Sequence, residues 1–205
     1  MSQLKLVERT AETQLDTEYG KFRFLVYRER KTGKEHIVLV KPWRPPSPLA
    51  REDRATTPLV RIHSECATGD IFASEFCDCG PQLHEALKRI QKEGGILIYL
   101  KQEGRGLGLT EKIKAYELQR KGMDTVEANL VLGHLADERN YDIPVEMLNC
   151  IGVKKLRLLT NNPDKIKALE DAGFEVERVP LILALKTQRG KKYLKVKQKK
   201  LGHLG

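Results

Sequence analysis

The chain of 205 residues has no long hydrophobic run and few aromatic residues, 6% of the total. No stretch approaches the roughly 18 apolar residues of a membrane-spanning helix, which argues against a membrane protein. No charged and then apolar segment opens the chain, so we expect no secretory leader. Only four cysteines are present. With no export signal, they indicate the reducing cytoplasm and argue against a disulfide framework.

Acidic residues are absent from residues 181–205, which contain eight lysines and arginines. Without those eight of the 37 basic residues, 29 remain against 28 acidic ones, so the formal net charge of +9 belongs to this end of the chain. A basic tail can bind polyanions, but a solvated chain end is the commoner case. We therefore expect one folded domain at 1–185, a basic tail at 186–205 and no nucleic-acid partner.

Strand and helix signals alternate along most of the chain, which predicts an α/β fold. A hairpin is expected from strands at Phe22–Arg28 and His36–Val40, followed by a proline-rich loop at 42–58. Further strands are expected at 59–63, 96–100, 156–159 and 174–179, and helices at about 81–93, 111–121 and 163–172. We predict a single domain with a mixed sheet flanked by helices and an antiparallel N-terminal hairpin.

A glycine-rich turn follows the expected strand at 96–100. The glycines of residues 104–108 let backbone N–H groups approach an anion at the start of a helix, for which Thr110 is the expected cap. Glu103 and Arg105 lie at this strand-to-helix turn, where open α/β sheets place ligands. The turn matches neither the P-loop nor the dinucleotide fingerprint, so alone it is weak evidence. Asn162 is the expected cap of the last helix, with Pro163 at its first position.

Cys66, Cys77 and Cys79 are the strongest chemical signal in the sequence. Three thiolates are one ligand short of a closed tetrahedral zinc site, which is the layout of a catalytic ion that keeps a position for water. Cysteine softness favours zinc over magnesium or calcium. Two other interpretations stay open: small buried hydrophobic side chains, or a structural site completed by a histidine or Cys150. Cys150 lies in an apolar, helix-like run and is expected in the core.

These cysteines belong to a series of ordered motifs that spans most of residues 59–181. The motifs are Arg61-Ile62-His63-Ser64-Glu65-Cys66-x-Thr68-Gly69-Asp70, Cys77-Asp78-Cys79-Gly80-x-Gln82-Leu83, Gln102-Glu103-Gly104-Arg105-Gly106, Lys112-Ile113-x-Ala115-Tyr116, Asp124-Thr125-Val126-Glu127-Ala128-Asn129, Asp137-Glu138-Arg139-x-Tyr141 and Leu158-Leu159-Thr160-Asn161-Asn162-Pro163. In this order they resemble GTP cyclohydrolase II, the first enzyme of riboflavin biosynthesis.

The resemblance implies that Cys66, Cys77 and Cys79 hold one Zn²⁺ per subunit, whose water attacks C8 of guanine. That carbon would leave as formate, and pyrophosphate would be released. The product would be 2,5-diamino-6-ribosylamino-4(3H)-pyrimidinone 5′-phosphate. The resemblance also implies Mg²⁺ on the triphosphate and a homodimer. Residues that match the family's GTP contacts are Arg61, Ile62, His63, Ser64, Glu65, Gln82, Glu103, Gly104, Arg105, Thr125, Thr160 and Lys165.

Three further residues match catalytic positions of the family. Arg139 matches its proposed nucleophile toward the α-phosphorus, Asp137 its proton acceptor, and Tyr116 a tyrosine needed for complete ring opening. A guanidinium is almost always charged. Arg139 therefore also suits an electrostatic clamp on the α-phosphoryl group, and both roles stay open. The main departure from the family is Phe76, where arginine is common.

Two alternatives to this function are weighed. A paralogue that stops at the formamide intermediate is disfavoured, because such paralogues differ at the position of Tyr116. A structural-zinc module that binds nucleic acid is disfavoured by the near-neutral charge of the body without its tail.

Overall fold

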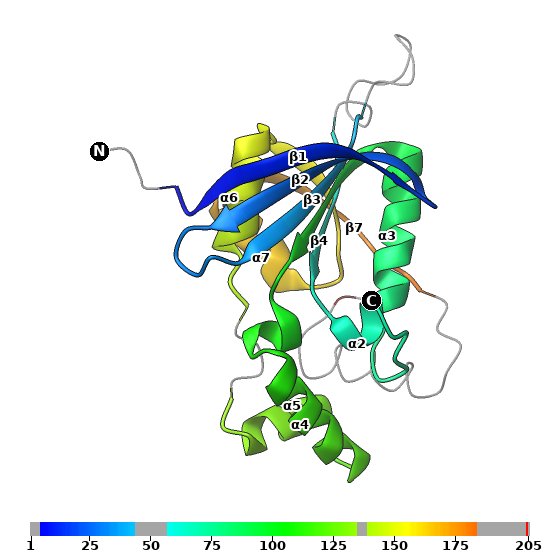
Figure 1. The fold of residues 1–205 in the computed structure, drawn as a ribbon, viewed down its shortest axis with the longest axis vertical. Helices are drawn as coiled ribbons and strands as arrows, with labels where there is room; N and C mark the ends of the chain where they lie inside the picture. The colour runs from blue at the N-terminus through cyan, green and yellow to red at the C-terminus, as the bar shows by residue number, and fades with distance from the viewer. Residues whose placement is uncertain (1–4, 44–56, 135–138, 184–203, 205) are drawn as a thin grey trace. The chain divides into compact units, whose positions relative to one another are not determined.

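The computed structural model describes residues 5–43, 57–134, 139–183 and 204. Asp137, most of the proline-rich loop and nearly all of the basic tail lie outside these residues. The predicted fold class, a single α/β domain with a mixed sheet and an antiparallel N-terminal hairpin, is confirmed. Its seven-stranded sheet has the order β1-β2-β3-β5-β4-β6-β7 (Figure 1).

One half of the sheet is antiparallel and the other half is parallel. The antiparallel strands are β1 (Val7–Thr17), β2 (Gly20–Glu29), β3 (Glu35–Lys41) and β5 (Gly95–Leu100), each paired with the next. Strand β4 (Leu59–Ser64) pairs in parallel with β6 (Lys155–Leu159), and β6 pairs in parallel with β7 (Glu175–Val179). Parallel strands bring their carboxyl ends to one edge, which is where α/β sheets bind ligands.

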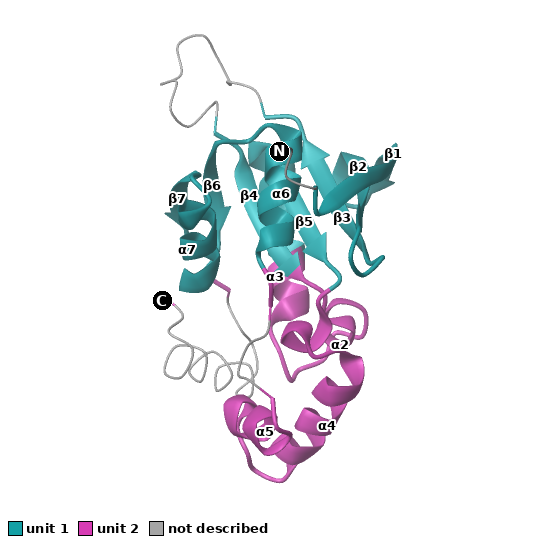
Figure 2. Ribbon diagram, turned by 90° about the vertical axis from the view of Figure 1, so that its left-hand side faces the viewer, with its two compact units in different colours: residues 1–63, 84–101, 141–181 teal, residues 64–83, 102–140, 182–205 magenta. Residues whose placement is uncertain are grey.

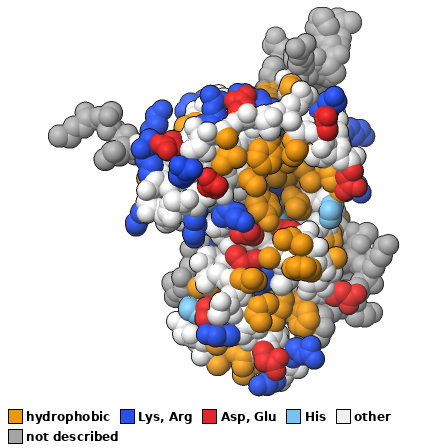
Figure 3. Space-filling view, in the orientation of Figure 1, with side chains coloured by type: hydrophobic (Ala, Val, Ile, Leu, Met, Phe, Trp, Pro, Cys, Tyr) orange, Lys and Arg blue, Asp and Glu red, His pale blue; other side chains and the backbone are white. Residues whose placement is uncertain are grey.

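Strand β1 was not predicted, because it does not read as a strand with a buried face. Only Val7 is buried and most of its other side chains are exposed. Arg9 pairs with Glu12 at 3.1 Å, and Arg30 pairs with Glu8 at 2.7 Å. Both signs of charge gather along this edge strand in Figure 3. Charged side chains on an edge strand protect it from pairing with another chain.

Six α-helices and one 3₁₀ helix are assigned in the described residues. They are α2 (Ala67–Asp70), α3 (Cys79–Glu93), the 3₁₀ helix η1 (Glu103–Gly106), α4 (Leu109–Arg120), α5 (Thr125–Val131), α6 (Asp142–Ile151) and α7 (Pro163–Asp171). The prediction that Thr110 caps α4 is wrong, because the helix already begins at Leu109 after Gly108 and no side chain caps it. The Asn162 cap is confirmed: its side chain accepts from the backbone N–H of Asp164 at 2.9 Å. None of these helices is long and apolar enough to cross a membrane.

The chain divides into two compact units that interleave along the sequence (Figure 2). Unit 1 comprises residues 1–63, 84–101 and 141–181 and contains the sheet. Helices α6 and α7 cover one face of its sheet through Met147, Leu148 and Leu169, which join the buried cluster formed with β2–β6. Cys150 of α6 is exposed, so the expectation that it lies in the core is wrong.

Unit 2 comprises residues 64–83, 102–140 and 182–205. It contains α2, the first residues of α3, η1, α4 and α5. Helix α5 is held by a capping box, in which Asp124 accepts from the backbone N–H groups of Val126 and Glu127. The three predicted metal ligands all belong to this unit.

Candidate functional site

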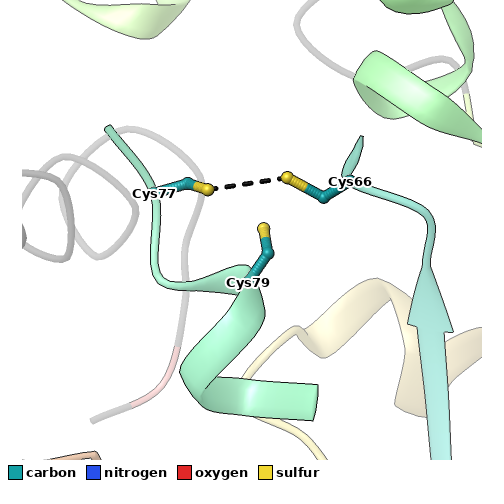
Figure 4. A group of neighbouring side chains, drawn as sticks. All are labelled: Cys66, Cys77 and Cys79. Carbon is teal, nitrogen blue, oxygen red and sulfur yellow. Dashed lines mark hydrogen bonds between the residues drawn. The ribbon is translucent and has the colours of Figure 1, made fainter. Parts of the chain in front are cut away.

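The sulfur atoms of Cys66, Cys77 and Cys79 lie within 4.8 Å of one another, and those of Cys66 and Cys77 are 3.5 Å apart (Figure 4). Thiolates bound at about 2.3 Å to one tetrahedral zinc ion lie about 3.8 Å apart, so the observed spacing fits such an ion. Among the described residues, no histidine or carboxylate joins this group. The three cysteines, named here the cysteine trio, therefore offer three sulfur ligands to one ion.

Two glycines allow the backbone to close around the cysteine trio. A Cβ atom on Gly69 would lie 2.7 Å from the Cys77 sulfur and 3.1 Å from the Cys66 sulfur. A Cβ atom on Gly80 would lie 2.3 Å from the carbonyl oxygen of Gly69. Any larger residue at Gly69 would fill the space that the sulfur atoms share. The local backbone is thus shaped around the trio, which supports its assignment as a metal centre.

The segment that carries Cys66 is fixed on both sides by carboxylates. The backbone N–H of Cys66 donates to Asp70 Oδ2 at 3.0 Å, which closes the short helix α2 onto its own start. The next N–H, that of Ala67, donates to Glu103 Oε2 at 2.6 Å. Glu103 comes from η1, the glycine-rich turn, so this turn and the first cysteine form one hydrogen-bonded assembly.

Lys112 of α4 joins the same assembly. Its Nζ donates to the Cys66 sulfur at 2.9 Å and to Glu103 Oε1 at 2.8 Å. Burial acts to lower the pKa of Lys112, but these two hydrogen bonds outweigh it and raise the pKa well above its usual value. Hydrogen bonds from Cys77 and Cys79, and then the ammonium of Lys112, lower the pKa of the Cys66 thiol. The site therefore favours a thiolate at Cys66, the form that binds metal.

Sequence reasoning did not identify Lys112. A signal was present: Lys112 and Tyr116 are four residues apart in the helix that follows the glycine-rich turn, so both side chains share one helix face. The predicted helix from about Glu111 contains both residues. The sequence pattern alone does not show that their shared face points toward the cysteines.

Tyr116 lies beside the cysteine trio. Its hydroxyl is 3.2 Å from Thr68 Oγ1, and Thr68 Oγ1 is 3.7 Å from the Cys66 sulfur. The ring stacks on Phe76, with centroids 4.7 Å apart and planes inclined by 19°. Burial, followed by the negative charge of Cys77, raises the pKa of Tyr116. The phenol therefore stays protonated and is able to donate a hydrogen bond.

The predicted substrate contacts divide between the two units. Unit 1 holds Arg61, Ile62, His63, Thr160 and Lys165, and unit 2 holds Ser64, Glu65, Gln82, Glu103, Gly104, Arg105 and Thr125. The five in unit 1 are all buried and lie on β4, just after β6 and on α7.

In unit 1, hydrogen bonds fix the predicted cationic contacts at the carboxyl ends of β4 and β6. Arg61 Nη1 donates to the carbonyl oxygen of Leu159 at 3.0 Å, and Lys165 Nζ donates to that of Ile62 at 2.8 Å. The ring of His63 stacks on Tyr99, with centroids 5.6 Å apart. Positive charge thus collects at the sheet edge that favours anionic ligands.

Backbone geometry marks the glycine-rich turn in unit 2. Gly104 and Arg105 both have φ of 61°, the left-handed region, which is unusual for a residue with a side chain such as Arg105. Such strain gathers at ligand-binding sites. Gln82 donates to Asp78 Oδ2 at 2.6 Å, and Thr125 is the first residue of α5. The hydroxyl of Ser64 is buried without a hydrogen-bond partner among the described residues.

The predicted catalytic pair is described only in part, because Asp137 lies outside the described residues. Arg139 is half-buried and precedes α6. The backbone next to it is held by Gln102, whose Nε2 donates to the carbonyl oxygen of Asn140 at 2.9 Å. Gln102 directly precedes η1, so the start of the glycine-rich turn also fixes this segment.

Comparison with known proteins agrees with these features. The sequence pattern described as GTP cyclohydrolase II matches residues 8–180. The chain belongs to the GTP cyclohydrolase II family. It is 49% identical to GTP cyclohydrolase-2 of Haemophilus influenzae, over 99% of this chain and 90% of the relative.

It is also 49% identical to riboflavin biosynthesis protein RibBA of Phocaeicola vulgatus, over 99% of this chain. The chain spans about half the length of that relative, 48%. Among solved structures, RibBX, a two domain 3,4-dihydroxy-2-butanone 4-phosphate synthase from A. baumannii, is 20% identical with a TM-score of 0.49. At that level the likeness says nothing about this chain's chemistry.

Proposed function

We propose that this chain is a zinc-dependent GTP cyclohydrolase II. It hydrolyses GTP to 2,5-diamino-6-ribosylamino-4(3H)-pyrimidinone 5′-phosphate and releases formate and pyrophosphate. The observation that carries the proposal is the cysteine trio in a chain of this family: three sulfur ligands at zinc-compatible spacing, with no fourth ligand among the described residues. This is the donor set of an open, catalytic zinc site.

Each part of the site has a role in this reaction. Zn²⁺ bound to the trio would supply an activated water for attack on C8 of guanine. Tyr116 keeps its proton, and its contact with Thr68 holds the hydroxyl beside the cysteine trio as a hydrogen-bond donor. Asp137 and Arg139 act at the α-phosphorus, Arg139 as nucleophile or as a clamp on phosphoryl charge. Arg61, Arg105 and Lys165 are among the residues that contact GTP, whose triphosphate carries Mg²⁺.

The remaining features of the proposal concern the whole molecule. Residues 1–185 form the catalytic domain, and residues 186–205 form a basic tail. The protein acts in the cytoplasm as a homodimer with one Zn²⁺ per subunit, and GTP is its small-molecule partner. The high identity to a relative named GTP cyclohydrolase-2, most of whose length this chain covers, supports the proposal.

Incubation of the purified protein with GTP, Zn²⁺ and Mg²⁺ tests the proposal. We expect formate and pyrophosphate in equal amounts, both measured per GTP consumed. Pyrophosphate without formate would instead indicate the paralogue that stops at the formamide intermediate.

Two cysteine variants test whether the metal centre is needed for ring opening. Cys66→Ser should abolish formate release because the trio loses a ligand. Cys150→Ser is the matched control, since Cys150 is exposed and outside the trio. Full formate release by Cys66→Ser would show that the trio does not carry the chemistry.

A further inference from the structure

Lys112 lies against a predicted metal ligand, yet no role follows for it from the reaction described above. Its ammonium donates to the Cys66 sulfur at 2.9 Å. The side chain is only 11% exposed, so this contact is shielded from water. A buried cation next to a sulfur ligand has an electrostatic effect on the whole cysteine trio.

Glu103 holds this cation in place. Its Oε1 accepts from Lys112 at 2.8 Å and from the backbone N–H of Gly104 at 2.8 Å. Its other oxygen accepts from Ala67, the residue after Cys66. All of these contacts lie within unit 2, and the Glu103 side chain is 10% exposed. The pair is therefore built into the metal centre and does not lie on the surface.

Charge explains what the ammonium of Lys112 does beside the Cys66 sulfur. Three thiolates and one divalent cation leave a net negative charge in a partly buried site, which is costly without compensation. A hydrogen bond from a cation to a ligand sulfur offsets that charge and reduces how much electron density the sulfur donates. A metal ion held there keeps more of its positive charge for the substrate. Partners of this kind commonly tune metal affinity and reactivity.

We propose that Lys112, oriented by Glu103, is a positioning residue of the metal centre that orders the Cys66 sulfur and offsets the negative charge of the cysteine trio. The inference rests on the proposed function only in that a divalent metal binds the trio. It assigns no contact between Lys112 and GTP.

Cobalt(II) serves as the probe, because it binds thiolates and its sulfur-to-metal charge-transfer band reports on the sulfur. Three purified variants are compared with the unchanged protein: Lys112→Met, Lys112→Arg and Lys114→Met. Lys114 is the matched control, since it lies on the same helix but is exposed and paired with Glu111 at 2.8 Å. Metal affinity is measured by competition with a chelating dye.

For Lys112→Met we expect cobalt and zinc affinity to fall about 10- to 100-fold, because the loss of an ordered Cys66 sulfur costs more than its stronger electron donation gains. The charge-transfer band should move to longer wavelength, because the sulfur lone pairs rise in energy without the cation. Lys112→Arg should recover most of both properties, and Lys114→Met should match the unchanged protein. A role in folding alone would lower the yield of folded protein without moving this band.

Unaltered affinity and an unmoved band in folded Lys112→Met would overturn the inference and leave the proposed function standing. If the unchanged protein itself binds no cobalt at the trio, the metal centre is wrong and the inference fails with it. The two failures are thus distinguishable in one titration, without measuring turnover.

Discussion

Phe76 shows how one substitution changes the surroundings of a predicted catalytic residue. The resemblance implies arginine at this position, but here an aromatic ring stacks on Tyr116 within unit 2. A stacked pair restrains the tyrosine ring while its hydroxyl contacts Thr68. The stack therefore places a geometric restraint on Tyr116 beside the cysteine trio.

Removing this stack should impair ring opening more than phosphate chemistry. In Phe76→Leu, losing the aromatic pair should cost about 1 kcal/mol in holding Tyr116 in place. This corresponds to a roughly fivefold lower rate of ring opening. We expect formate release to fall by that factor relative to pyrophosphate release, with both products assayed in one reaction. Tyr116→Phe, which keeps the stack but removes the hydroxyl, is the comparison and should show the larger defect. An equal decline of both products in Phe76→Leu would argue against this role.

Gly69 is the residue whose size is most tightly limited by the trio. In Gly69→Ala, the new Cβ would meet the Cys77 sulfur at 2.7 Å, a separation that requires the sulfur to move. We expect metal binding to be lost or weakened more than tenfold, a cost of over about 1.4 kcal/mol, when metal content is measured after dialysis. Gly33→Ala is a control, because its added Cβ meets no atom within 4 Å although φ is positive. Stoichiometric metal in Gly69→Ala would contradict the tight packing of the site.

The sequence predicted the grouping of the three cysteines better than their surroundings, for a physical reason. Cysteine is rare in this chain and its spacing carries chemical meaning, so Cys66, Cys77 and Cys79 stood out. Lysine is common, and Lys112 gains its meaning only from contacts with Cys66 and Glu103 that are distant in sequence. The roles of Asp137 and Arg139 came from the resemblance alone and stay predictions.

At the scale of elements, strands with a buried face were predictable and the edge strand β1 was not. Strands β3 and β5 contain continuous apolar runs because they are buried in the sheet. Strand β1 reads as polar because its pairing with β2 uses the backbone, which the side-chain pattern does not reveal. Helix α7 was predicted from Asn162 and Pro163, whose local chemistry sets its start.

The contact between β3 and the end of β5 includes a buried histidine, His36, which is 0% exposed. Its Nδ1 accepts from the backbone N–H of Lys101 at 3.1 Å, so that nitrogen carries no proton. Its Nε2 lies 3.6 Å from Glu29, which favours the charged form. Burial is the larger effect, and it lowers the pKa of His36 below its ordinary value of 6.5.

This shift predicts that acid destabilises unit 1. The unfolded chain binds a proton at His36 near pH 6.5, whereas the folded protein resists doing so until a lower pH. The contribution of His36 is therefore complete above pH 6.5 and is lost as pH falls toward the lowered pKa, with a slope of up to about 1.4 kcal/mol per pH unit. The free energy of unfolding, measured by urea titration between pH 7.5 and 5, should show this loss.

His36→Gln keeps an acceptor for the Lys101 N–H but does not titrate, so its stability should depend less on pH in this window. His84→Gln is the matched control, since His84 is exposed on α3. If His36→Gln and the unchanged protein lose stability in parallel, another group is responsible for the acid sensitivity.

At the scale of the whole molecule, the predicted GTP contacts are shared between two units with different sources of stability. Unit 1 has a continuous hydrophobic cluster built from the sheet, α6 and α7. Unit 2 has small helices and the cysteine trio, whose ligands come from segments on either side of residues 71–76. A metal ion joining these segments would supply stability that apolar packing supplies in unit 1.

Metal removal should therefore loosen unit 2 and spare the sheet. After treatment with a strong chelator, we expect faster amide hydrogen exchange in residues 64–83 and in α4, with little change in β3, β5 and β6. The reason is that the segments that carry the trio, and Lys112 which contacts Cys66, lose the metal ion that joins them. The core cluster of unit 1 contains none of these residues. Readdition of Zn²⁺ should restore protection, and Mg²⁺ at the same concentration should not, because thiolates bind magnesium poorly. Equal loss of protection in both units would mean that the metal stabilises the fold as a whole, and no change in either would argue against a metal centre at the trio.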